Sequence, residues 1–344
     1  MLEPRQSGQP CRVGGSGYER VGEGPISRDI HTRGGGMVTT RRWVRVGRVF
    51  DPSTVERAHP KLLTHASNPV AVPLGGSVFR FLYSGRDDRN RSSVGWVDVD
   101  LKTLAVVGVA ASPSLEHGLD GSWYRDGVGI GNAFPDGHVI RVGFMAWQAS
   151  GLGHWRGDIG LATLQGDGTL SVDGDGPWLG ASEEDPVSLS YPWVMARPDG
   201  SLDVWYGSTV TWDAGNGEML HVIKHARRVQ DGTWQFSGQV IPHVLGVAQA
   251  FSRPCVVAGV TAPYDMWFSY RAGDGTPYRI GHATSGDGMR WEPDLSGTVL
   301  RASDGGWDAT MVEYPYVFDY DGRWYMAYNG DGYGRTGIGL AVLD

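Results

Sequence analysis

The chain has 344 residues and a formal net charge of −8, which argues against a nucleic-acid partner because such proteins usually carry a basic stripe. Its 2 cysteines, Cys11 and Cys255, are too few for a disulfide framework, and no run approaches the ~20 apolar residues of a membrane span. The 53 glycines, 14 tryptophans and 14 tyrosines favour a protein with many turns and aromatic sheet faces.

The N-terminal stretch differs from the rest of the chain. Residues 1–36 are rich in Gly, Arg, Ser and Pro and contain no apolar run. This composition indicates neither a secretory signal nor a packed segment. We therefore interpret residues 1–40 as a disordered tail or the product of a mis-set start codon, and residues 41–344 as a single folded domain. Without a secretory signal, the expected location is the cytoplasm.

A strand–turn–strand unit recurs after the strand-like stretch Trp43–Phe50. In its clearest copy, the last one, period-2 alternation flanks Asp321-Gly322, which is a strong hairpin signal. Four copies carry a proline, at positions 69, 192, 254 and 315, which are 123, 62 and 61 residues apart. Because the first gap is twice the others, we assign to it a looser copy that starts near Asp126.

The spacing of these units predicts the fold class. Each unit has two further strand signals, so that about four short strands fall in every ~61 residues, with no 3.6-residue apolar period. We therefore predict an all-β fold, a five-bladed β-propeller with about four antiparallel strands per blade. A β-sandwich would not explain so constant a spacing. Trp43–Phe50 is expected to complete the last blade as its outer strand.

Candidate binding residues follow from the geometry of such blades. If the first strand of each blade lines the central channel, its start and the end of the antiparallel second strand lie on one face. Residues at these corners are polar and aromatic, as a sugar site requires, because rings stack on sugars and polar groups fix hydroxyls. The candidate substrate-binding residues are Asn68, Arg86, Asp87, Gln148, Tyr191, Trp212, Arg253, Arg271 and Asn329.

Two carboxylates at these corners, Glu313 and Asp126, precede apolar strands and lie outside any turn signature. A carboxylate that is merely solvated would be unusual there. The aspartates of Asp-Gly pairs, such as Asp199 and Asp321, are explained by their turns. Glu313 and Asp126 are therefore the first candidates for catalysis.

The repeated units, the Ser-Gly-Asp-Gly-Met-Arg-Trp element at 285–291 and the Glu-Tyr-Pro-Tyr-Val stretch at 313–317 resemble the five-bladed β-propeller glycosidases. These include arabinanases and xylosidases of family 43, the invertase and levansucrase type, and mannoside phosphorylases of family 130. The resemblance covers about residues 41–344. It implies hydrolysis of a glycosidic bond by carboxylates that act as acid and base around the channel.

The catalytic pattern of family 43 is matched only in part. Asn68 stands where that family has an aspartate at the start of the first blade, and the third-blade corner at 188–192 lacks the usual glutamate. The resemblance therefore implies roles for the carboxylates that remain. We assign Glu313 as the general acid, Asp126 as the base or second carboxylate, and Asp185, just upstream of the third-blade corner, as its reserve.

Three functions stay open on this evidence. The first is a hydrolase. The second is a phosphorylase, because Asn68-Pro69 is closer to the phosphorylase type and Arg86, Arg253 and Arg271 could bind phosphate. The same arginines could bind a sugar carboxylate or pair with Glu313 and Asp126. The third is a non-catalytic carbohydrate-binding propeller. In each case the expected partner is an oligosaccharide or glycoside, with no nucleic acid and no membrane.

No cofactor is expected. No His/Cys cluster has zinc spacing, and the glycines at 127, 129 and 131 are not followed by the helix that a dinucleotide site needs. The resemblance allows a structural calcium in the channel, but no residues identify its ligands.

Overall fold

Antiparallel pairing divides the strands of this protein into sets of four. The computed structural model describes residues 41–149, 154–296 and 299–344, all within the unit Arg41–Asp344. Within these residues there are 20 strands, a 3-10 turn at Pro52–Thr54 and a four-residue helical element, α1 (Asp331–Gly334). The predicted all-β class is confirmed. The interpretation of residues 1–40 as a tail falls outside the described residues.

The strands of the first four sets are consecutive in the chain, and the last set combines the three final strands with β1. The first set is β2 (Thr64–Gly75), β3 (Val78–Arg86), β4 (Ser92–Asp100) and β5 (Ala105–Val109). The second is β6 (Gly127–Asp136), β7 (Val139–Ala149), β8 (Trp155–Leu164) and β9 (Leu170–Val172). The third is β10 (Ser188–Ala196), β11 (Leu202–Thr211), β12 (Leu220–Arg228) and β13 (Trp234–Gln239). The fourth is β14 (Ala250–Ala258), β15 (Tyr264–Arg271), β16 (Arg279–Ser285) and β17 (Glu292–Asp294). The last is β18 (Glu313–Tyr320), β19 (Arg323–Asn329), β20 (Ile338–Leu343) and β1 (Trp43–Phe50).

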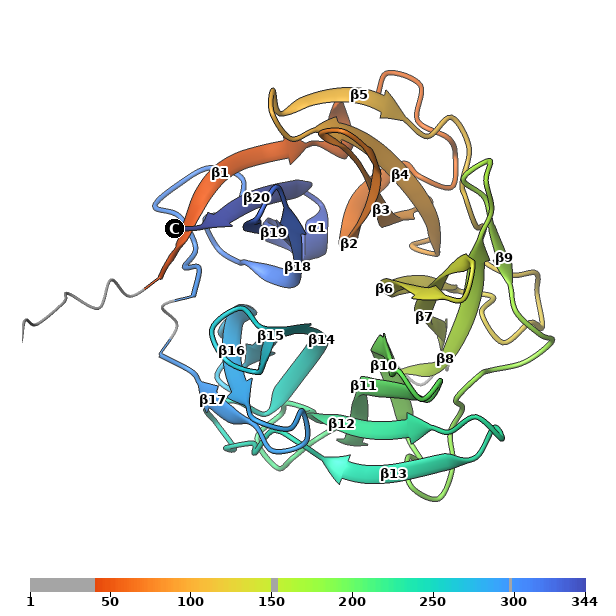
Figure 1. Ribbon diagram of the computed structural model, residues 1–344, viewed down its shortest axis with the longest axis vertical. Helices are drawn as coiled ribbons and strands as arrows, with labels where there is room; N and C mark the ends of the chain where they lie inside the picture. The colour runs from red at the N-terminus through yellow and green to blue at the C-terminus, as the bar shows by residue number, and fades with distance from the viewer. Residues whose placement is uncertain (1–40, 150–153, 297–298) are drawn as a thin grey trace, which may run out of the picture. The chain divides into compact units, whose positions relative to one another are not determined.

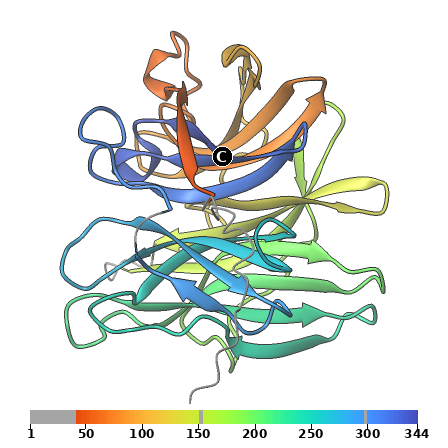
Figure 2. The same cartoon turned by 60° about the vertical axis from the view of Figure 1, so that its left-hand side comes forward.

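The first strand of each set lies nearest the centre of Figure 1. β2 contacts β6, β6 contacts β10, β10 contacts β14, β14 contacts β18, and β18 contacts β2. Figure 2, turned by 60° about the vertical axis, shows the strands of the third set below those of the first and last sets. Buried aromatic rings fill the space between the first strands, where Trp193 of β10 lies 5.3 Å from Tyr316 of β18 between ring centroids. This arrangement brings the same end of all five first strands together.

The N-terminal strand of the described chain completes the last set. β1 pairs antiparallel with β20, with Trp43 opposite Leu343 and Phe50 opposite Ile338. The Trp43 ring also meets Trp267 of the fourth set edge-on, at 5.7 Å between centroids. The predicted role of Trp43–Phe50 as the outer strand of the last unit is confirmed.

An irregularity recurs at the same place in every first strand. The pairing register skips two residues after Ser67, Ile130, Ser190, Ser252 and Glu313. In four sets the skipped pair is a residue followed by proline, and the residue before proline has a left-handed φ: Asn68 (57°), Tyr191 (31°), Arg253 (51°) and Tyr314 (55°). Such a φ is costly for a non-glycine residue, and more so before proline, so the surrounding structure must hold it in place.

The Ser-Gly-Asp-Gly-Met-Arg-Trp element at 285–291 forms the tight turn between β16 and β17 of the fourth set. The Asp287 side chain accepts the backbone amides of residues 289 and 290, at 2.8 and 2.9 Å. The indole N–H groups of Trp291 and of Trp205 from the third set both donate to the Gly288 carbonyl at 3.0 Å. This element is therefore a turn whose tryptophan packs against the third set.

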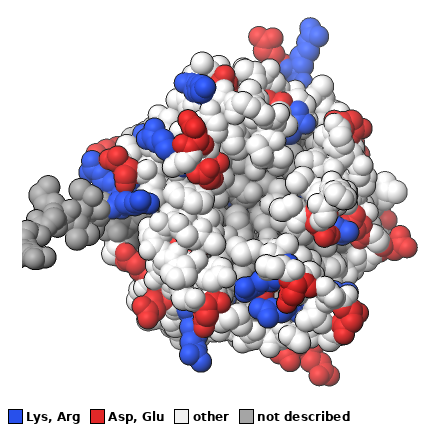
Figure 3. Space-filling view, in the orientation of Figure 1, with Lys and Arg blue, Asp and Glu red and all other residues white. Residues whose placement is uncertain are grey.

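Charged side chains lie mostly around the periphery of the face seen in Figure 3, and uncharged residues surround its centre. Among the described residues, no helix has the length and apolar character needed to cross a membrane.

Candidate active site

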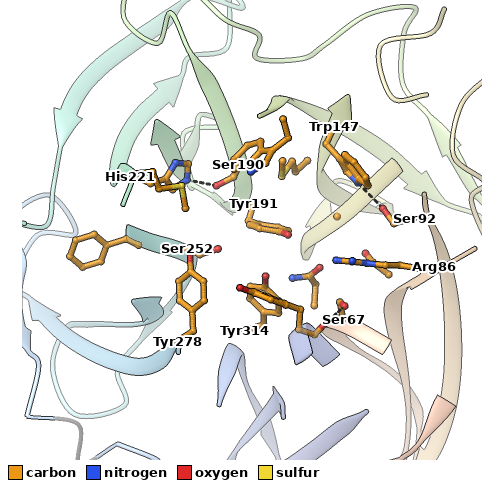
Figure 4. Close-up of a pocket in the computed structure, with 18 of the residues that line it drawn as sticks. Ser67, Arg86, Ser92, Trp147, Ser190, Tyr191, His221, Ser252, Tyr278 and Tyr314 are labelled. Atoms are coloured by element: carbon orange, nitrogen blue, oxygen red, sulfur yellow. Dashed lines mark hydrogen bonds between the residues drawn. The ribbon is translucent and has the colours of Figure 1, made fainter. Parts of the chain in front are cut away.

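A cavity of about 360 Å³ lies where the ends of the sets meet around the first strands (Figure 4). Its lining combines aromatic rings with hydroxyl groups and two arginines. The aromatic members are Trp147, Trp155, Tyr191, Phe251, Tyr278, Tyr314 and Tyr333. The serines are Ser67, Ser84, Ser92, Ser190 and Ser252, and the arginines are Arg86 and Arg271. Such a surface suits a sugar, whose ring faces are apolar and whose edges are hydroxyl groups.

The strained residues of the first strands form part of this lining. Asn68, Tyr191 and Tyr314, each with a left-handed φ before a proline, all contribute to it. The rings of Tyr191 and Tyr314 lie 5.6 Å apart between centroids. The recurring irregularity thus turns side chains of several first strands toward a common centre, and the backbone strain coincides with the candidate site.

Glu313 is buried just beside this lining. It occupies the last regular position before the irregularity of β18, where the other first strands have serine or isoleucine. Its side chain is 0% exposed, and neither carboxyl oxygen has a hydrogen-bond partner. Burial raises the pKa of Glu313 well above its usual range, although the positive charges of Arg271, Arg86 and Arg253 act in the opposite direction. The geometry therefore favours a neutral, protonated carboxyl group.

Arg271, whose charge acts on Glu313, forms an ion pair with a second carboxylate, that of Glu218. Its guanidinium lies 2.8 Å from the carboxylate of Glu218, measured from Nε to Oε2, and a second nitrogen donates to Oε1 at 2.9 Å. The guanidinium also lies 4.8 Å above the centre of the Tyr278 ring. Since the charge of Arg271 also acts on Glu313, this arginine stands in the electrostatic field of both carboxyl groups.

Hydroxyl and imidazole groups form another part of the wall. The Ser190 hydroxyl lies 2.7 Å from Nε2 of His221, whose Nδ1 lies 2.8 Å from the Thr209 hydroxyl (Figure 4). Burial lowers the pKa of His221 to about 3, so the imidazole is neutral at physiological pH. Nearby, the Trp147 indole donates to the Ser92 hydroxyl at 2.8 Å. These bonds fix two serine hydroxyls in the wall.

No family model matches the chain. Two proteins of Mycobacterium tuberculosis match most of it: "Uncharacterized protein MT1551" is 39% identical over 306 residues, and "Uncharacterized protein Rv1502" is 38% identical over 306 residues. Each match covers 88% of this chain and 99% of the mycobacterial protein. The chain belongs to their family.

Solved structures show which fold the chain shares. A structure titled "Glycoside hydrolase" superposes with a TM-score of 0.67 at 14% identity, covering 87% of this chain and 90% of the other. A member of the GH130 family, described as mannoside phosphorylases that include hydrolases of beta-1,2 mannosidic linkages in Candida mannan, has a TM-score of 0.61 at 13% identity, with 87% and 93% covered. A thermostable family-43 glycoside hydrolase has 0.60 at 14% identity, with 83% and 89% covered. The predicted resemblance to the propeller glycoside hydrolases is confirmed for the fold.

Four of the predicted substrate-binding residues line the cavity, namely Asn68, Arg86, Tyr191 and Arg271. Three others lie outside the lining and have structural partners. Asp87 accepts from Arg91 at 2.8 Å, and Gln148 donates to the Trp123 carbonyl at 2.9 Å. Trp212 stacks on His154, with 4.7 Å between ring centroids, behind the cavity residue Trp155.

The remaining two predicted contacts, Arg253 and Asn329, are buried cross-links. Arg253 is 1% exposed, and its guanidinium donates to backbone carbonyls of three first strands, among them Pro69 at 2.6 Å, Tyr314 at 2.7 Å and Gly131 at 3.2 Å. Burial lowers its pKa to about 10, so it stays charged at neutral pH.

The Asn329 amide joins the last set to the first. Its oxygen accepts the backbone N–H of Asn68 at 2.8 Å, and its nitrogen donates to the carbonyls of Ala66 and Gly337, both at 2.8 Å. These bonds place Asn329 in the framework behind the site instead of in the lining.

Asp126 and Asp185, the two other predicted catalytic carboxylates, also lie outside the cavity lining. The register of β6 corrects the alignment that selected Asp126, because Ile130 occupies the position equivalent to Glu313. The Asp126 carboxylate instead accepts the Ala149 amide at 2.8 Å.

Asp185 is 1% exposed and has three partners that use its charge. It accepts hydrogen bonds from Tyr206 at 2.8 Å and Ser208 at 2.5 Å, and it lies 2.9 Å from the Lys224 ammonium. A catalytic role for Asp126 or Asp185 thus stays a prediction without support from the cavity geometry.

Sequence reasoning missed a third source of site residues. In an antiparallel set the third strand starts where the second ends, so its start lies on the same face. Ser92 and Trp155 begin the third strands β4 and β8, and Tyr278 immediately precedes β16. Glu218 and His221 flank the start of β12 in the same way. The third strand of each unit is recognisable in the sequence, and the residues at its start are the signal that indicates these positions.

Among the described residues, no group of three or more His, Cys, Asp or Glu side chains is placed to hold a metal ion. The calcium that the resemblance allows thus finds no ligand cluster in that part of the chain.

Proposed function

We propose that this protein cleaves a glycosidic bond, with Glu313 as the general acid. The observation that carries the proposal is a carboxyl group, buried beside an aromatic and hydroxyl-lined cavity, whose oxygens have no hydrogen-bond partner and whose pKa is raised. A protonated carboxyl group is what departure of a sugar's leaving oxygen requires. The fold shared with glycoside hydrolases supports this assignment.

We further propose Glu218 as the second carboxylate. Like Asp126 and Asp185 it lies outside the lining, but its carboxylate pairs with the lining residue Arg271, and it directly precedes the lining residue Met219 in the chain. Two nitrogens of Arg271 lie 2.8 and 2.9 Å from its carboxylate oxygens, and this pairing would orient the group as the base that activates water. A buried carboxyl group with a raised pKa and a second carboxylate paired with Arg271 would supply the two carboxyl groups that acid/base hydrolysis needs.

The proposal carries two structural requirements. The five sets, with β1 completing the last, would be the blades of one closed five-bladed propeller, whose first strands present the site. Because the oxygens of Glu313 are covered, a bound substrate must also displace the side chains between them and the cavity. A site that stays covered would favour the alternative, a carbohydrate-binding propeller without catalysis.

Release of reducing sugar from a panel of oligosaccharides and alkyl furanosides and pyranosides, with and without phosphate, tests the proposal, because these leaving groups must be protonated. Replacing an essential general acid is expected to lower kcat about 100-fold or more, so Glu313→Gln should lose activity while the matched variant of the exposed Glu292, Glu292→Gln, keeps it. Full activity in Glu313→Gln would overturn the assignment of the acid. Activity that appears only with phosphate would make the protein a phosphorylase.

A further inference from the structure

Among the described residues, Arg86 is the arginine of the cavity lining that forms no ion pair with a carboxylate. It ends β3, and Figure 4 shows its side chain extending toward the space between Tyr191 and Tyr314. Its guanidinium donates to the amide oxygen of Asn90 at 2.6 Å, and among the described residues no carboxylate lies within ion-pair distance of it. The hydrogen bond to Asn90 holds the group but does not neutralise its charge.

The groups around Arg86 leave that charge uncompensated. Arg271, the other arginine of the lining, is already paired with Glu218. Glu313 is within electrostatic reach of Arg86, but burial keeps its carboxyl group in the neutral form. Burial, followed by the charges of Arg86 and Arg335, lowers the pKa of His65 to about 4, so this neighbour adds no charge at neutral pH.

We propose that Arg86 binds an anionic group, a carboxylate or a phosphate ester, carried by the sugar that occupies the cavity. A planar guanidinium forms two parallel hydrogen bonds with either group, and the partly enclosed cavity weakens the competition from water. Aromatic rings such as Tyr278 and Tyr314 would hold the sugar ring, while Arg86 selects the acidic substituent. This inference rests on the proposed carbohydrate site and narrows its substrate class to acidic sugars.

Binding to a glycan array tests the inference without any need for turnover. The array pairs acidic glycans, uronates and sugar phosphates, with their carboxyl-reduced or dephosphorylated counterparts. Loss of an arginine that makes charge-assisted hydrogen bonds typically weakens binding about tenfold or more. The full chain is expected to bind acidic members at least about tenfold tighter than neutral ones, and Arg86→Gln should remove this preference. Arg89→Gln, an equal loss of charge at an exposed position three residues away, should keep it.

The outcomes test the anion site separately from the proposed hydrolysis. Preference confined to uronates or to sugar phosphates identifies which anion the sugar carries. The inference would be overturned if the neutral counterparts bind as tightly as the acidic glycans, or if the preference survives in Arg86→Gln. It would also be overturned if no acidic glycan on the array binds. Calorimetric binding of inorganic phosphate alone through Arg86 as tightly as of a sugar phosphate would overturn it as well. Acidic binding without turnover would instead overturn the hydrolase proposal and leave the anion site standing.

Discussion

At the scale of single residues, the buried carboxyl group of Glu313 couples folding to pH. Its pKa is raised in the folded state above the value of about 4.5 expected for the unfolded chain. Above pH 4.5 the unfolded state therefore loses this proton first. The free energy of unfolding falls by up to about 1.4 kcal/mol per pH unit from this group until the folded-state pKa is reached.

Glu313→Gln removes this titration and keeps the side-chain volume. We expect the melting temperature of Glu313→Gln, relative to wild type, to rise as pH increases from 4.5 to 8, whatever the offset between the two at low pH. Thermal unfolding followed by tryptophan fluorescence at several pH values measures this difference. Glu292→Gln, at an exposed position, should follow wild type throughout. Parallel curves for wild type and Glu313→Gln would contradict the buried, neutral carboxyl group.

Residue identity was partly readable from the sequence. Glu313 stood out because a carboxylate before an apolar strand has no turn to explain it, and the structure places it beside the cavity. The same argument selects Asp126, but Asp126 lies four residues before Ile130, which occupies the position equivalent to Glu313 in the second set. The second set has Gly131 and Asn132 where the others have a residue followed by proline, so its alignment lacked the marker that fixed the rest.

At the scale of elements, Arg253 joins first strands that are far apart in the chain. Its guanidinium donates to carbonyls of β2, β6 and β18, and among them Tyr314 and Pro315 directly follow Glu313. Arg253 thus acts as a positioning residue for the backbone that carries the proposed acid. The sequence predicts that Arg253 lies near the start of the first strand of its set, as observed. Its left-handed φ turns the side chain into the interior, away from the cavity. Period-2 alternation does not predict this change of side-chain direction.

Arg253→Gln would leave several buried carbonyls without a donor. Because each lost hydrogen bond to a charged group typically costs about 1.5–3 kcal/mol, we expect the free energy of unfolding to fall by at least about 3 kcal/mol. Urea unfolding measures this loss. Arg290→Gln, at an exposed position, provides the control and should change stability by less than about 0.5 kcal/mol. A loss as small as that of the control would show that Arg253 does not cross-link the strands.

At the scale of the whole molecule, the repeat spacing carried most of the prediction. Strands and hairpins recur with period-2 patterns, and the gap between prolines indicated the missing copy, whose irregularity after Ile130 lies where the spacing requires it. The composition of the cavity was harder to predict, since it depends on which strand ends meet in space. The pairing of β1 with β20 confirms the predicted outer strand of the last unit, and it joins the first and last strands of the described residues.

A disulfide across this pairing tests how far it controls the stability of the whole. Val44 of β1 and Val342 of β20 are direct partners in the ladder, so Val44→Cys with Val342→Cys places two thiols on one face of neighbouring strands. The bond would close a loop of nearly the entire described chain, for which loss of unfolded-state entropy stabilises the folded state by up to about 5 kcal/mol.

We expect the oxidised double variant to melt at a higher temperature than its own reduced form, and reductant to abolish the difference. With Cys11→Ser included in every variant, each single variant should be insensitive to reductant, because the remaining native cysteine, Cys255, is buried. An oxidised double variant that melts no higher than its reduced form would show that unfolding begins elsewhere than at the junction of β1 and β20.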